Sequence, residues 1–99
     1  MTSTAGCSGE IAVSTTARVG PDIQCGMVWF SACKGNTGHV YIGFNEDGPI
    51  ELPDGVDGVV CGFELIKGDK LNALPIANLN LLDFVAANDG ESITYIAVR

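Results

Sequence analysis

The most informative part of this chain is the run IQCGMVWFSACKGNTGHVYIGF, which occupies residues 23–44. Its first part, residues 23–32, is apolar on both faces, which is typical of a central strand covered by a second sheet or a neighbouring subunit. Residues 34–38 contain the Gly and Asn of a tight turn, and a second apolar run follows at residues 39–44. The run therefore predicts two antiparallel strands joined as a hairpin.

The second apolar run alternates with a period of two. Val40, Ile42 and Phe44 share one face and are expected to point inward, whereas Tyr41 and Gly43 take the other face. This alternation predicts a strand of an antiparallel sheet.

The rest of the chain repeats the pattern of brief strands and turns, because 13 glycines and four prolines punctuate short apolar runs. Ile11, Val13 and Thr15 alternate with smaller residues, and Val59, Cys61, Phe63 and Leu65 are expected on one face of a later strand. Residues 45–58 are expected to form a long connection with a short edge segment at 49–52, and residues 67–70 a polar turn. A strand and a one-turn helix are expected within 71–82. An Asp-Gly hairpin that joins 83–87 to 92–98 is expected to close the chain.

These features predict an all-β fold, an antiparallel β-sandwich or jelly-roll-like barrel. A chain of 99 residues is long enough for one hydrophobic core. We expect a single domain over residues 9–99. Residues 1–8 are small and polar, so we expect a flexible N-terminal arm whose Thr2, Ser3 and Thr4 are candidate contact residues.

Charge and hydropathy exclude several partners. The formal net charge of −7 repels phosphate backbones, so nucleic acid is not expected as a partner. No apolar run approaches the roughly 20 residues of a membrane span, and no secretory signal is visible, so we expect no membrane partner and synthesis in the cytosol.

The sequence contains no constellation typical of an enzyme or a metal site. His39 is the only histidine, and its position beside a glycine turn favours a solvated side chain over a catalytic pair. The acidic residues of 45–58 match no EF-hand spacing, so a solvated loop is favoured over a calcium site. Cys7, Cys25, Cys33 and Cys61 form no Cys-x-x-Cys pair, which favours free thiols, with a disulfide as the alternative in an oxidising exterior. We expect no catalytic residue, metal or cofactor.

Met27, Trp29 and Phe30 form the densest aromatic and sulfur cluster. These residue types are enriched in protein cores and at the centres of interfaces, so both roles stay open for the cluster. For Trp29 itself, burial in the core is the expectation.

The octet Asn36-Thr37-Gly38-His39-Val40-Tyr41-Ile42-Gly43 resembles the Asn-x-Gly-x-Val-Tyr-(Val/Ile)-Gly signature of small tailed-phage virion proteins that look like head decoration, or cement, proteins. Residues 65–71 are similar to the Leu-x-Pro-Gly-Glu-x-Leu turn of that family, with Lys67 in place of the proline. The resemblance extends from about residue 23 to the terminal strand, and the motif positions are Asn36, Gly38, Val40, Tyr41 and Gly43.

This resemblance implies a jelly-roll or sandwich subunit, often a homotrimer, that is made in the host cytoplasm and binds the major capsid protein on the outer surface of the head. A tail, neck or fibre-base component is the alternative within the virion. An alternative of another class is a module that binds carbohydrate through Trp29 or Tyr41, or calcium through the acidic loop.

Overall fold

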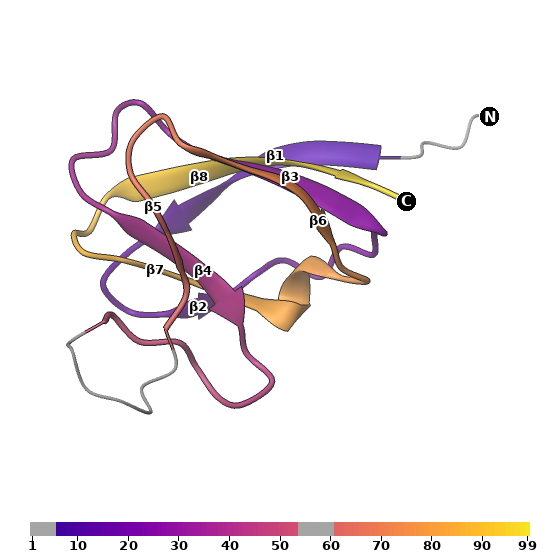
Figure 1. Cartoon of the computed structure of the whole chain (residues 1–99), viewed down its shortest axis with the longest axis horizontal. Coiled ribbons are helices and arrows are strands. Elements are labelled where there is room, and N and C mark those ends of the chain that lie inside the picture. Colours follow the sequence, from indigo (N-terminus) through magenta and orange to yellow (C-terminus); the bar gives the residue numbers. More distant parts are fainter. Residues whose placement is uncertain (1–5, 54–60) are drawn as a thin grey trace.

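The computed structural model describes residues 6–53 and 61–99 as two packed antiparallel sheets of four strands each (Figure 1). We call them sheet A and sheet B. The strands of sheet A, in spatial order, are β1 (Gly6–Val13), β8 (Glu91–Val98), β3 (Met27–Ala32) and β6 (Lys70–Pro75). Those of sheet B are β2 (Arg18–Val19), β7 (Leu82–Ala86), β4 (Val40–Phe44) and β5 (Phe63–Leu65). The predicted all-β sandwich is confirmed.

The order of the strands is that of an eight-stranded jelly roll. Every connection except the one from β4 to β5 passes from one sheet to the other. The two predicted hairpins at 34–38 and 88–91 are therefore wrong, because β3 and β4 lie in different sheets, as do β7 and β8. Both turns reverse the chain, but they do so across the sandwich.

The core lies between the two sheets, where side chains of alternate residues meet. Phe30 of β3 and Phe84 of β7 contact each other edge to face, with ring centroids 5.7 Å apart. Ile11 and Val13 point into this core as their alternation predicts, and Phe30 is a core residue. Other buried members are Val28, Ala32, Val40, Ile42, Leu65, Leu79, Leu82, Ala86 and Ile93.

The outer face of sheet B is covered by the chain that follows β4. Ile50 of this segment packs on Tyr41 and Val85, and the three form a second apolar cluster. The buried carboxylate of Asp83 accepts hydrogen bonds from the Ile50 N–H at 3.2 Å and from Asn45 Nδ2 at 3.0 Å. The predicted edge segment at 49–52 does not form a strand, because its backbone is used to cover the sheet.

Tyr41 takes the face opposite Val40 and Ile42, as predicted, and the segment just described buries it there. Phe44, at the end of β4, is expected to point inward but is 55% exposed. Phe63 is 61% exposed because β5 is the edge strand of sheet B. Val59 lies outside the described residues.

The N-terminal boundary also differs from the expectation. Gly6, Cys7 and Ser8, predicted as part of a flexible arm, pair with Val98, Ala97 and Ile96 of β8. The backbone hydrogen bonds of β1 extend the strand beyond its apolar residues. Thr2, Ser3 and Thr4 lie outside the described residues.

The later elements agree with the sequence. The predicted turn at 67–70 forms over Lys67 and Gly68, and Lys70 already begins β6. The segment η1 (Leu79–Leu81) is a single turn of 3-10 helix whose Asn78 cap accepts a hydrogen bond from the Asn80 N–H. Within the described residues η1 is the one helical segment, and no helix there is long enough to cross a bilayer.

Candidate binding surfaces

The motif residue Asn36 holds the connection between β3 and β4 against sheet A. Its Nδ2 donates to the Ser92 carbonyl at 2.9 Å, and its Oδ1 accepts from the Ser92 N–H at the same distance. The side chain is buried, so these bonds satisfy an amide that would otherwise be costly to bury. Asn36 is therefore a structural residue.

Glu91 secures the same connection from the first position of β8. Its carboxylate accepts hydrogen bonds from the backbone N–H of Thr37 at 3.1 Å and of Gly38 at 2.6 Å. The Thr37 N–H contributes most to lowering the pKa of Glu91, and the Gly38 N–H adds to it. A β-carbon on Gly38 would overlap the side-chain amide of Asn88 and lie 3.3 Å from Glu91 Oε2, which explains the glycine at this motif position.

The remaining motif residues pack β4 against its neighbours. Val40 is a core residue, and Gly43 lies so near Gly62 that a β-carbon on Gly43 would approach the Gly62 Cα to 3.0 Å. The motif residues Asn36, Gly38, Val40 and Gly43 thus shape the fold.

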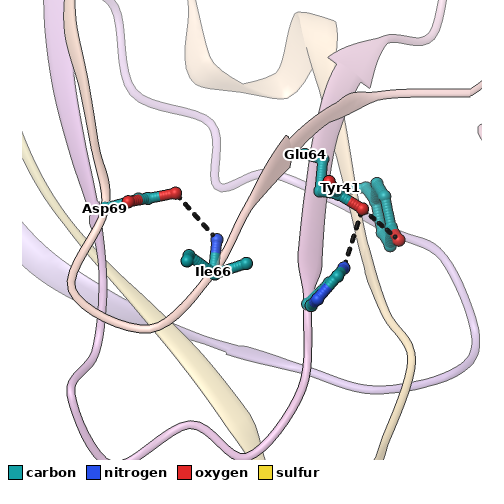
Figure 2. A network of polar contacts seen from close by, with 5 residues as sticks. Tyr41, Glu64, Ile66 and Asp69 are labelled. Atoms are coloured by element: carbon teal, nitrogen blue, oxygen red, sulfur yellow. Dashed lines mark hydrogen bonds and ion pairs between the residues drawn. The ribbon is translucent and has the colours of Figure 1, made fainter.

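Tyr41 and His39 meet the same carboxylate on the neighbouring strand (Figure 2). Tyr41 donates its phenol hydrogen to Glu64 Oε2 at 3.0 Å, and His39 Nδ1 lies 2.7 Å from that oxygen. The pKa of Glu64 is lowered, first by its hydrogen bond with His39, and the pKa of Tyr41 is raised, first by burial and then by Glu64. Beside it, the Ile66 N–H donates to Asp69 Oδ2 at 3.1 Å within the turn before β6.

This network has a structural role. The His39 Nδ1 contact holds the imidazole against the Glu64 carboxylate, and Tyr41 donates to the same oxygen. The contacts connect β4 to the edge strand β5, which has three residues and needs side-chain support.

The described residues contain no group of three His, Cys, Asp or Glu side chains that could hold a metal ion. Cys7, Cys25 and Cys33 are free thiols. Cys25 donates to the Ile76 carbonyl at 3.2 Å, and burial raises its pKa, which favours the protonated thiol.

The outer face of sheet A carries a hollow of about 660 Å³. Trp29 lies at its centre on the interior strand β3 and is 37% exposed, so the expectation that Trp29 is a core residue is wrong. Its partner in register on β8 is Ile96, which is 56% exposed. The two side chains form an apolar floor, and Met27 lies half-buried one row away.

A polar row crosses the four strands beside this floor. Glu10, Thr94, Ser31 and Lys70 occupy matching positions on β1, β8, β3 and β6. Sequence reasoning missed this row, because its members are single polar residues of separate strands and only the register brings them together.

A β-bulge shapes the end of the hollow on β6. Val28 pairs with Leu74 and Phe30 with Leu71, so two residues, Asn72 and Ala73, oppose Trp29 alone. Ala73 has a φ of 44°, a conformation that costs free energy for a residue with a β-carbon. The bulge places Asn72 in the lining of the hollow.

A second exposed surface lies at the margin of sheet B, and we call it the apolar rim. It consists of Phe44, Phe63 and Leu81. Phe63 pairs with Ile42, two residues before Phe44, so the two phenylalanines are diagonal neighbours within reach of each other. Leu81 precedes Leu82, the partner of Phe44 on β7.

The chain matches no family model, no curated protein and no solved structure.

Proposed function

We propose that this chain is a non-enzymatic structural protein of a phage particle, a head decoration protein that associates with itself and binds the major capsid protein on the outer surface of the shell. The observation that carries the proposal is the apolar rim, in which two phenylalanines lie more than half exposed on neighbouring strands. Exposed aromatic side chains that adjoin one another are typical of protein interfaces.

The architecture supports a role that requires rigidity. Two sheets share one core, and side-chain hydrogen bonds of Asn36 and Glu91 fix the connection between β3 and β4. A protein of this kind binds a lattice through many repeated weak contacts, which become tight because neighbouring sites raise the effective concentration. The resemblance of residues 36–43 to decoration proteins favours this use of the sandwich.

The negative charge supports a basic docking surface. With a net charge of −7 the chain is attracted to basic patches, and this attraction weakens as salt screens it. Adsorption to a capsid is therefore expected to fall with ionic strength, whereas self-association through the apolar rim is expected to depend little on salt.

Light scattering over a range of concentrations tests the self-association. We expect a homotrimer whose stability falls in Phe44→Ser and Phe63→Ser, by about 2 kcal/mol or more if these residues dominate the interface. Ile96→Ser is the matched control, because Ile96 has an exposed fraction similar to that of Phe44 but lies on sheet A. A chain that is monomeric at every concentration would contradict this part of the proposal.

Co-sedimentation with undecorated heads of the phage that encodes the chain tests the partner. We expect saturable binding that decreases with salt, and a reconstruction of the particle should place the protein on the head. Density for the chain at the tail, neck or fibre base instead would support the alternative within the virion and overturn the capsid assignment.

A further inference from the structure

We propose that the hollow on the outer face of sheet A binds a neutral oligosaccharide, with one sugar ring stacked on Trp29. This site is separate from the apolar rim, which lies on sheet B. A negative result for sugar binding would therefore leave the proposed decoration function unaffected, and a failure of the decoration function would leave this site unaffected.

Trp29 provides a rigid platform for such a ring. It lies on the interior strand β3, where it pairs with Ile96 of β8, and its two chain neighbours pair with β6 on either side of the bulge. One face of a pyranose consists of C–H bonds and packs on an aromatic ring, while the hydroxyl groups project at the edges. Trp29 and Ile96 offer the apolar surface that this face requires.

Polar side chains surround the platform where the hydroxyl groups of a stacked sugar would lie. Asn72 lies across the bulge from Trp29, and Ser31 and Thr94 lie one row away. In the described part of the chain, the side chains of Asn72 and Glu10 make no hydrogen bond within the protein, so their donors and acceptors are available. A mostly apolar hollow with a few such groups is the usual form of a small-molecule site, whose volume is about 300–1,000 Å³.

The charges of the hollow favour a neutral ligand over an anionic one. Glu10 and Lys70 lie at opposite ends of the polar row, on the two edge strands, with Thr94 and Ser31 between them. Three inter-strand spacings separate them by about 14 Å. Phosphate or polyanion binding requires clustered cations, and this row supplies one lysine and one opposing carboxylate.

The strained backbone of β6 supports a binding role. A residue with a β-carbon at positive φ is retained where surrounding structure requires it, and such outliers and bulges cluster at binding sites. Here the outlier Ala73 follows Asn72 directly opposite Trp29. The bulge therefore modifies the sheet at the position where the sugar would bind.

Fluorescence titration of the full chain tests the proposal, because Trp29 is its only tryptophan. The probes are maltohexaose, cellohexaose, N-acetylchitohexaose and mannohexaose, with a heparin hexasaccharide as the anionic comparison. We expect at least one neutral probe to change the Trp29 emission saturably and heparin to leave it unchanged. A folded protein that responds to none of the neutral probes, or to heparin alone, would overturn the proposal.

Calorimetric titration of variants with the responding probe locates the site. Trp29→Ala should weaken binding at least about tenfold, Trp29→Phe should recover part of it, and Asn72→Ala should weaken it less. Phe63→Ser, on the apolar rim, should bind as the wild type does. Undiminished sugar binding to a folded Trp29→Ala protein would overturn the assignment. Loss of the oligomer in Trp29→Ala would overturn it too, because the hollow would then be the site at which a second copy of the chain binds.

Discussion

Asn36 pairs with Ser92 through both ends of its side-chain amide, in the manner of a neighbouring strand. The backbone register between β3 and β8 ends at Ala32 and Ile93, and the Cys33 N–H donates to the Ser92 carbonyl. The Asn36 amide then bonds both the carbonyl and the N–H of Ser92. The side chain thus extends the hydrogen bonding of sheet A after the backbone of β3 has left the sheet.

Asn36→Ala should lower the free energy of unfolding by about 1–3 kcal/mol, because two polar groups of Ser92 lose a buried partner. Asn72→Ala is the matched control: the same atoms are removed from an exposed side chain, and a change within about 0.5 kcal/mol is expected. Urea denaturation measures both variants. Equal effects would show that the Asn36 contacts contribute nothing specific.

Glu91→Gln should destabilise the fold near neutral pH and remove part of its acid sensitivity. The pKa of Glu91 is lowered below its ordinary value of 4.5, first by the Thr37 N–H, so the stabilisation is complete above that value and is lost as the pH falls through the folded-state pKa. The difference in urea midpoint between wild type and Glu91→Gln should therefore shrink from about pH 7 to about pH 3. A difference that stays constant over this range would contradict the assignment.

Gly20→Ala should destabilise the protein by about 1–3 kcal/mol. A β-carbon at position 20 would overlap the carbonyl oxygen of Leu79 and would lie 2.9 Å from the Phe84 ring. Gly35→Ala is the control, because a β-carbon there meets nothing within 4 Å and should change stability by less than about 0.5 kcal/mol. Thermal unfolding of the two variants distinguishes close packing from a general effect of replacing glycine.

Glu64→Gln should lower the pKa of Tyr41 without restoring its ordinary value. Burial is the largest cause of the raised pKa and remains, whereas the hydrogen bond to an ionised carboxylate and the charge that opposes the phenolate are removed. The ultraviolet absorbance of the phenolate during alkaline titration measures the shift, and a Tyr95→Phe background isolates Tyr41, since the chain has two tyrosines. An unchanged titration curve would mean that the Tyr41 to Glu64 bond does not form in solution.

Alternation along the strands was a reliable guide to the core. Ile11, Val13, Val40 and Ile42 are inward as expected, because strand side chains alternate between faces whatever the topology. The same rule could not place Trp29. Residues 23–32 are apolar at odd and even positions alike, so the pattern does not say which set meets the second sheet.

The sheet assignment of the strands could not be predicted from the turns. Gly and Asn at 34–38 permit the chain to reverse, but the same residues serve a hairpin and a connection between sheets. What separates the two cases is the distant contact of Asn36 and Thr37 with Ser92 and Glu91, over 50 residues away in sequence. The polar row of the hollow could not be predicted either, because strand register alone brings its four residues together.

The place of β8 between β1 and β3 has a consequence for synthesis. Neither strand can acquire this neighbour until residues 91–98 have left the ribosome, so the nascent chain carries β1 and β3 with unpaired edges throughout translation of the domain. Such long-range pairing also slows folding, since distant segments must meet before any of their bonds form. Completion of sheet A therefore waits for the last strand of the domain.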